Sequence, residues 1–439
     1  MSSEIVGRGR LFAYGIAETP IAMAAIPVSL FLPAFYTGEL GLGLASVGLI
    51  LMLARFWDVI TDPLIGYLSD RTRTRFGRRR PWIIVSVPLV ILAVYKLFIP
   101  TEPVSELYLL GWIMLLWLGW TLFNIPYFAW GAELSPNYEQ RTRITGWRTI
   151  LGLVGTLLAV GVPALSQGLF DFGGRSGEAM YLVGIGAMVL IPICVGTLVV
   201  SVPERQTFAP AQLHAWDGLK IMWGNGPFKR LILAFACSTM GTSLAAPLFV
   251  MFISHVVGDP TAAPKVVVAH FIANIIGVPF WVWLAKKTDK HVSWLASLFI
   301  MATVFPTFML LEEGDLVLAA VLLFLIGIGA GNFSVVPSSM KADVIDLDRI
   351  QSGEDRAGLF FAAWSTATKL VSALGVGIAF PTLAWLGFDP KIENGPDEIF
   401  ALQAFYSFVP IVFYLFAAAL VWRYPITREH HEEIRQQID

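Results

Sequence analysis

Two carboxylates, Asp58 and Asp62, lie four residues apart within the apolar run 44–68. At that spacing an α-helix presents both side chains on one face, about one turn apart, and Thr61 lies on nearly the same face. Two carboxylates in an apolar setting cannot both stay ionised without a positive partner, so we expect them to share a proton or bind a cation. Oxygen ligands suit a hard ion. The spacing therefore predicts a sodium site at Asp58 and Asp62, with the Thr61 hydroxyl as a third ligand, or a proton on one aspartate.

The acidic pair also has a purely structural interpretation. Asp58 would then pair with Arg55, one turn earlier, and Asp62 would cap a kink before Pro63. We favour the cation or proton site, because a charge cluster that serves structure alone is costly in lipid.

Two basic residues stand apart in other apolar runs. Lys369 has no acidic neighbour on its own segment, so we expect its partner to come from another helix, with Asp58 or Asp62 the best candidates. Snorkelling to the membrane interface is its alternative. Arg148 lies near the start of the run 146–168, where it either contacts a ligand or anchors the helix at the interface. We assign Lys369 and Arg55 to coupling.

Further side chains are candidates for a ligand site. Asn124 and Phe128 share a helical face, with Thr121 one turn earlier. An amide beside a flat ring suits a hydroxylated ring that stacks and forms hydrogen bonds, although packing is an alternative for Phe128. Glu18 precedes Pro20, which interrupts the backbone hydrogen bonds of the helix. We expect Glu18 either to contact a substrate or proton or to be a packed, protonated carboxyl. The candidate substrate-binding residues are Glu18, Asn124, Tyr127, Phe128, Arg148 and Trp364.

These charges are exceptions in the chain as a whole. It has 439 residues, of which 56% are hydrophobic and 14% are charged, against about 25% charged in soluble proteins. The composition excludes a soluble enzyme, and no basic groove for nucleic acid is evident at a net charge of −2. Cys194 and Cys237 lie in apolar runs, which predicts neither a disulfide nor a metal site. We expect no enzymatic activity and no cofactor.

Twelve apolar runs of roughly 20 residues can each cross a hydrocarbon core of about 30 Å. They are approximately 11–36, 44–68, 81–100, 107–132, 146–168, 178–202, 229–255, 264–286, 292–311, 316–342, 357–387 and 400–423. The first run is too long for a signal peptide and leads directly into a second span, so we interpret it as a retained helix. The sequence therefore predicts an all-α, multi-pass membrane protein with twelve transmembrane helices.

The distribution of Lys and Arg fixes the orientation of these spans. Nearly all basic residues outside the spans lie in one set of connections, and the opposite loops hold only Arg175, Lys265 and Lys391. Basic loops face the cytoplasm. We therefore predict that both termini are cytoplasmic and that the protein resides in the cell membrane.

The longest charged connection divides the chain in two. We predict an N-terminal six-helix bundle at 1–203, a central cytoplasmic loop at 204–228, a C-terminal six-helix bundle at 229–423 and a cytoplasmic tail at 424–439. Two six-helix repeats with basic cytoplasmic turns are the organisation of major-facilitator transporters, in which substrate binds near the midplane. We assign the basic turn Arg71 to Arg80 to cytoplasmic gating contacts, with simple topology signalling as the alternative. Individual charged residues at the cytoplasmic turns are also assigned to gating. They are Asp70, Arg71, Arg141, Asp343 and Arg356.

Several stretches resemble one transporter family. Residues 55–72 read RFWDVITDPLIGYLSDRT, and residues 75–83 read RFGRRRPWI. Asn124-Ile125-Pro126-Tyr127 and Ala342-Asp343-Val344-Ile345-Asp346 match as well, as does Lys369. Together they closely resemble the signature of the glycoside-pentoside-hexuronide:cation symporters, the group typified by the bacterial melibiose permease. The resemblance covers both halves of the chain.

The resemblance implies roles for individual residues. Asp58, Thr61, Asp62 and Thr121 fall where the family binds its coupling cation, Lys369 matches a lysine linked to that site, and Arg148 matches an arginine near the sugar. The chain departs from the melibiose permease at Thr61, where that permease has an asparagine that favours sodium, so a proton is more plausible here. It also departs at Ala22 and Asn124, which stand where that permease holds its galactoside with aspartates, and at Phe128, which replaces a stacking tryptophan. A galactoside is therefore disfavoured as substrate.

We accordingly predict a cation-coupled (sodium or proton) secondary symporter that imports a sugar, glycoside or uronate by alternating access. The alternative is a carrier of a lysolipid or other amphipathic substrate on the same fold, because the resemblance extends to animal lysolipid carriers. A third hypothesis is a non-transporting sensor or scaffold, against which Asp58, Asp62 and Lys369 argue. The expected partners are a small-molecule substrate, the coupling cation and the lipid bilayer. We expect a monomer in a bacterial inner membrane.

Overall fold

The computed structural model describes residues 6–101, 103–135, 138–169, 176–204, 224–352, 357–427 and 429. Within these residues every regular element is a helix, and twelve helical segments are long and apolar enough to cross a membrane. The prediction of an all-α chain with twelve spans is therefore confirmed. Of the predicted gating residues, Arg356 and the side chain of Arg141 lie outside the described part of the chain.

The chain forms two compact units, residues 1–210 with 390–392, and residues 211–389 with 393–439. Much of the predicted central loop, residues 205–223, lies outside the described residues. The bundle boundaries at 203 and 229 therefore stay a prediction.

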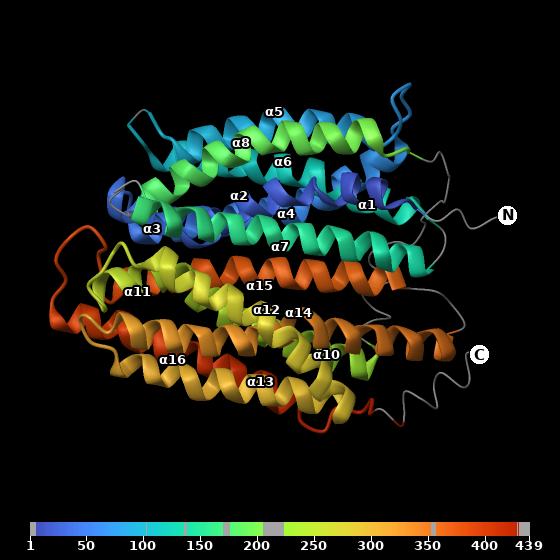
Figure 1. Cartoon of the computed structure of the whole chain (residues 1–439). Helices are drawn as coiled ribbons and strands as arrows, with labels where there is room; N and C mark the ends of the chain where they lie inside the picture. The colour runs from blue at the N-terminus through green and yellow to red at the C-terminus, as the bar shows by residue number, and fades with distance from the viewer. Residues whose placement is uncertain are drawn as a thin grey trace. The chain divides into compact units, whose positions relative to one another are not determined.

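The first unit is built from helices that follow the first six predicted runs (Figure 1). They are α1 (Arg8–Gly15), α2 (Glu18–Leu30), α3 (Leu32–Ala34), the π-helix η1 (Phe35–Glu39), α4 (Leu44–Arg71), α5 (Arg80–Phe98), α6 (Glu106–Glu133), α7 (Tyr138–Leu169) and α8 (Ser176–Ser201).

The second unit follows the last six runs. Its helices are α10 (Gly226–Ala245), the 3₁₀-helix η2 (Ala246–Leu248), α11 (Phe249–His255), α12 (Ala263–Lys287), α13 (Lys290–Val304), the 3₁₀-helix η3 (Phe305–Leu310), α14 (Leu316–Ser352), α15 (Ala357–Trp385) and α16 (Pro396–Val421).

Prolines explain why three predicted spans are divided into shorter helices. Pro20 has no backbone N–H to donate to the carbonyl of Ile16, and the Thr19 N–H bonds that carbonyl instead at 3.2 Å, which tightens the turn between α1 and α2. Pro247 and Pro306 lie in the 3₁₀ segments η2 and η3. The chain thus continues across the membrane with a local change of helix type at each of these prolines.

The helix that contains the tenth span is longer than the predicted span. The apolar run ends at 342, whereas α14 continues to Ser352. Outside the hydrocarbon core a helix needs no apolar residues, so the hydropathy pattern marks the end of the span and not the end of the helix.

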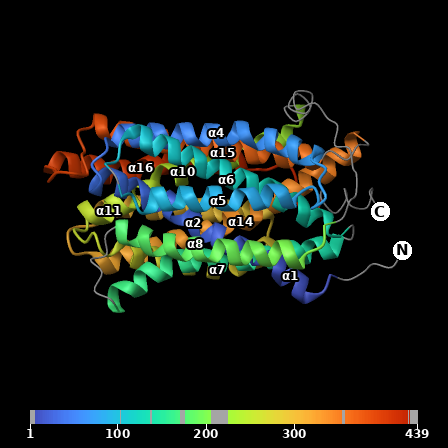
Figure 2. The ribbon, with the colours of Figure 1, turned by 90° about the horizontal axis from the view of Figure 1, so that it is seen from above.

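Within the first unit, α6 packs against α4 and α5, and α7 packs against α1 and α2 (Figure 1). Figure 2 shows this unit from above, where α5 lies between α6 and α8. A Cβ added at Gly155 of α7 would lie 2.0 Å from the backbone oxygen of Thr19 in α2, so this close approach needs a glycine. The hydroxyl of Thr19 also donates to the Leu151 carbonyl at 2.9 Å. These contacts fix α2 against α7.

Within the second unit, α12 and α14 form a close pair. A Cβ at Gly327 of α14 would lie 2.3 Å from the carbonyl oxygen of His270 in α12. Helix α10 packs against α15 and α16, and α13 packs against α14 and α16. Small residues at such crossings allow backbones to approach where lipid supplies no hydrophobic driving force.

Candidate functional site

The two predicted acidic ligands meet a hydroxyl from a neighbouring helix. Thr121 Oγ1 of α6 lies 2.8 Å from Asp58 Oδ1 and 3.0 Å from Asp62 Oδ1, both on α4. Asp58 is 3% exposed and Thr121 is 2% exposed, while Asp62 is half-buried. The packing of α4 against α6 thus brings together three of the residues predicted to bind a cation.

The number of protons available to Thr121, Asp58 and Asp62 determines what this group can bind. A threonine hydroxyl has one proton, so Thr121 donates to only one of the two carboxylates at a time. The other contact joins two acceptor oxygens unless its carboxyl carries a proton or a cation lies between the oxygens. The site is therefore suited to taking up one positive charge.

Arg55 and Thr61 occupy different positions around this pair. The Arg55 guanidinium lies over the ring of Trp117 in α6, with Cζ 3.6 Å from the ring centroid, and it interacts electrostatically with Asp58. The Thr61 hydroxyl donates to the backbone carbonyl of Asp58 at 3.3 Å. In this geometry Thr121, and not Thr61, is the hydroxyl that contacts both carboxylates, and the role of Thr61 as a cation ligand stays a prediction.

A second group of candidate residues gathers around Arg148 of α7. Its guanidinium carbon lies 4.3 Å from the centroid of the Phe128 ring, and its charge acts on the Glu18 carboxyl. Glu18 packs against α7, where a Cβ at Gly152 would lie 3.0 Å from its Cγ. Its Oε2 atom is buried and has no hydrogen-bond partner among the described residues. Since Phe128 is 41% exposed, the group combines a free ring face with a cation and an acceptor.

Tyr127 lies next to Phe128 in the chain and forms a reciprocal pair of hydrogen bonds with Tyr14. Its hydroxyl donates to the Tyr14 carbonyl at 2.8 Å, and the Tyr14 hydroxyl donates to the Tyr127 carbonyl at 3.1 Å. The two rings stack with centroids 4.6 Å apart, and Tyr127 is fully buried. This reciprocal pair ties α1 to α6 and holds the backbone beside Phe128, so direct contact of Tyr127 with substrate stays a prediction.

Helix α6 carries residues of both groups. Thr121 and Phe128 are seven residues apart, which is about two helical turns or ~10 Å along the axis. Asn124 lies between them and is half-buried. A change in the position of α6 would therefore act on the carboxylate pair and on the Arg148 group together.

A charge network lies where α4 ends and α5 begins. Arg79 Nη2 lies 2.6 Å from Asp70 Oδ1 and 2.7 Å from Glu133 Oε1 of α6, and its Nη1 donates to the Ser69 hydroxyl at 2.9 Å. Burial disfavours the charged form of Arg79, but Glu133 and Asp70 outweigh this effect and hold the pKa of Arg79 above its ordinary value. Arg71, also predicted to gate, lies instead over the Tyr67 ring at 4.0 Å.

Sequence reasoning did not predict that Arg79 pairs with both Asp70 and Glu133. Arg79 is only 3% exposed, although it lies in the basic turn Arg71 to Arg80, which the sequence predicts to make gating contacts or to signal topology. Glu133 directly follows the fourth predicted span, 107–132, and ends α6, so an acidic residue at a helix end was the available signal.

The second unit holds the remaining candidates. Trp364 is 8% exposed, and its ring packs against that of Phe235 with centroids 4.2 Å apart and the ring planes tilted by 33°. Asp343 accepts from Lys290 Nζ at 2.7 Å through each of its oxygens. Lys369 is half-buried and makes interactions within the structure. Since Lys369 and Asp58 belong to different units, their pairing stays a prediction.

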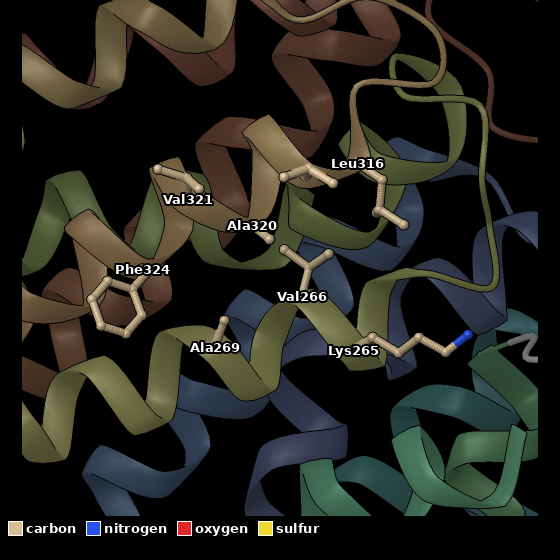
Figure 3. A pocket seen from close by; sticks show the side chains of 8 residues that line it. Lys265, Val266, Ala269, Leu316, Ala320, Val321 and Phe324 are labelled. Atoms are coloured by element: carbon tan, nitrogen blue, oxygen red, sulfur yellow. The ribbon is translucent and has the colours of Figure 1, made fainter. Parts of the chain in front are cut away.

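An apolar groove also lies in the second unit, between the starts of α12 and α14 (Figure 3). It has a volume of about 430 Å³, and Val266, Leu316, Val321 and Phe324 are among the residues that line it. Lys265 is the one charged lining residue. This lining offers little for binding sugar hydroxyls, so the groove does not enter the candidate site.

Known proteins resemble the chain over nearly its full length. The family model described as MFS/sugar transport protein matches residues 13–428. The chain is 25% identical to the sodium-dependent lysophosphatidylcholine symporter 1 of Gallus gallus, covering 97% of this chain and 88% of that one. It is 24% identical to the inner membrane symporter YicJ of Escherichia coli, covering 100% and 96%.

A solved structure supports the fold. The bacterial homologue of the human lysosomal transporter Spinster, in an inward-facing and unoccupied conformation, matches with a TM-score of 0.72 at 14% identity, covering 98% of each chain. At this identity the likeness concerns the fold alone, and it confirms the predicted major-facilitator fold. Taken with the match of the family model across residues 13–428, this shows that the chain belongs to the MFS/sugar transport protein family and is a multi-pass membrane transporter of the symporter type.

Proposed function

We propose that this protein is a secondary symporter that couples sodium or proton entry to import of a sugar, glycoside or uronate across a bacterial inner membrane. The observation that carries the proposal is the contact of one Thr121 hydroxyl with both Asp58 and Asp62. A buried group that gains a positive charge is what ion coupling requires, because the substrate-binding state must differ in energy with and without the ion.

The substrate would bind at the Arg148 group. Phe128 offers a ring face for the C–H surface of a sugar, while Arg148, Glu18 and Asn124 offer donors and acceptors for hydroxyls. Ion binding at the carboxylate pair would reach this group through α6, and it would release Lys369 in the second unit, which favours rocking of the two halves. The cytoplasmic orientation of both termini belongs to the same proposal.

A lysolipid or other amphipathic substrate is the second candidate. The relative from Gallus gallus is named as a sodium-dependent lysophosphatidylcholine symporter and matches 97% of this chain. An aromatic face beside a guanidinium would also suit a phosphate headgroup.

Reconstitution in proteoliposomes tests the proposal. Uptake of methyl glycosides, glucuronate and lysophosphatidylcholine is measured under an inward sodium gradient and under an inward proton gradient. We expect one substrate class to accumulate with one of the two gradients. Asp58→Asn and Asp62→Asn should abolish accumulation while sparing exchange, and Glu312→Gln, an exposed acid in a loop, should change neither. Full accumulation of substrate in both aspartate variants would contradict the proposal.

A further inference from the structure

Lys341 is a buried cation of the second unit whose ammonium group lies against aromatic rings. It is 6% exposed, and its Nζ lies 4.1 Å from the centroid of the Phe361 ring and 4.8 Å from that of Trp364. Phe235 packs against Trp364 in turn. Rings from α10 and α15 thus form one aromatic group around a charge from α14, and neither the acidic pair nor the Arg148 group uses it.

The charge of Lys341 is only partly compensated. Among the described residues, no carboxylate lies within ion-pair distance of its Nζ. Asp343, two positions along, points to another face of α14, and both its oxygens accept from Lys290. A cation–π contact offsets only part of the penalty for removing an ammonium group from water. An anion beside Lys341 would therefore be bound strongly.

One of the two rings beside the ammonium group is exposed. Phe361 is 53% exposed although its ring contacts the lysine. Trp364, already a candidate for substrate contact, presents its ring to the same ammonium group. A ligand that stacks on these rings would bring its polar groups to Lys341.

We propose that Lys341 binds an anionic group of the transported substrate, a carboxylate or a phosphate, and so selects anionic substrates over neutral ones of the same shape. This inference rests on the proposed function, because it names the substrate class of that transporter. A neutral sugar would leave the buried charge without a partner, whereas a uronate or a phosphate-bearing lipid would complete it.

Paired ligands that differ in charge test this inference. Binding to the purified full-length protein in sodium buffer is followed by thermal shift with methyl glucuronide against methyl glucoside, and with lysophosphatidic acid against monoacylglycerol. The first pair reports a carboxylate and the second a phosphate. We expect the protein to prefer the anionic member of one pair by about tenfold or more in apparent Kd. Equal affinity for both members of each pair would overturn the inference.

Variants test whether the preference for the anionic ligand depends on Lys341. Lys341→Met should reduce it to about twofold or less, whereas Lys341→Arg should keep most of it because the charge remains. Lys287→Met, which removes an exposed lysine at the end of α12, should leave it unchanged. A preference that persists in Lys341→Met also contradicts the inference. If the methionine variant does not fold, Lys341→Arg provides the test, because loss of the preference in that variant would contradict the inference.

The response to sodium separates this inference from the proposed function. If sodium stabilises the wild type and Lys341→Met equally, and no pair is discriminated, the inference is wrong while ion coupling stands. If neither sodium, nor a change of pH, nor any ligand alters the thermal stability of the wild type, both fall.

Discussion

Thr121 Oγ1 lies 2.8 Å from Asp58 Oδ1, although 63 positions separate the two residues in the chain. The contact exists because α4 and α6 pack along their length, and it places a polar hydrogen where two carboxylates converge. The proposed coupling mechanism depends on this relationship.

Loss of the Thr121 hydroxyl should weaken ion binding. A hydrogen bond to a charged group is worth about 1.5–3 kcal/mol, so Thr121→Val should reduce the apparent affinity for the coupling ion roughly tenfold or more, and Thr121→Ser should retain most of it. Thr61→Val is the matched comparison, because the Thr61 hydroxyl donates to the backbone of its own helix. Ion-dependent thermal shift measures all three. A larger loss in Thr61→Val than in Thr121→Val would contradict the geometry.

Arg148 and Phe128 should act as one unit in substrate binding. A cation–π contact is worth about 0.5–2 kcal/mol, so Phe128→Leu and Arg148→Lys should each raise the apparent KM for uptake by roughly 2- to 30-fold. In the double variant the free-energy change calculated from KM should be smaller than the sum of the changes in the two single variants. Ile150→Ala, at an exposed position of α7, serves as the control. Fully additive effects would show that the ring and the guanidinium act separately.

Two glycines of α7 should respond oppositely to alanine. At Gly155 a Cβ would meet the Thr19 carbonyl oxygen, whereas at Gly161 nothing lies within 4 Å. Overpacking of this kind is destabilising by about 1–3 kcal/mol, while alanine in place of glycine inside a helix is otherwise favourable by about 1 kcal/mol. We expect Gly155→Ala to lower the thermal unfolding midpoint in detergent and Gly161→Ala to hold or raise it. Equal unfolding midpoints for the two variants would contradict the close packing of α2 against α7 at Gly155.

Removal of the Glu133 charge should destabilise the end of the first unit. Glu133→Gln leaves the guanidinium of buried Arg79 with Asp70 as its remaining ion-pair partner among the described residues, and breaking a buried pair costs on the order of 3 kcal/mol. The unfolding midpoint should fall by several degrees, while Glu106→Gln, at an exposed site on the same helix, should change it little. An unchanged midpoint in Glu133→Gln would show that the network adds no stability.

The pH dependence of the same network follows from the raised pKa of Arg79. A group whose pKa is raised in the folded state contributes its full stability below its unfolded pKa, and the contribution is lost only as pH rises through the folded value. For arginine that window lies in strong alkali. The difference in midpoint between wild type and Glu133→Gln should therefore stay constant from about pH 6 to pH 9, and a marked change across this range would assign the effect to another group.

The segments that cross the membrane, and the residue types that could do chemistry within them, were predictable from the amino-acid sequence. Hydropathy is a local property, so runs of apolar residues predicted twelve spans, and a charge inside such a run is conspicuous because lipid penalises it. The spacing of Asp58 and Asp62 was equally readable, since both lie on one helix whose periodicity is known.

Which of these residues contact one another depends on how the helices pack, and this was not predictable from the sequence. Thr121 faces the aspartates, Glu133 reaches Arg79, and Lys341 lies on Trp364, and each of these contacts joins different helices. Such contacts depend on the rotation and spacing of packed helices, which small residues such as Gly155 set through close approach. Hydropathy carries no information about that rotation, which explains why Lys341 and Arg79 could be recognised as buried cations only after the helices were placed side by side.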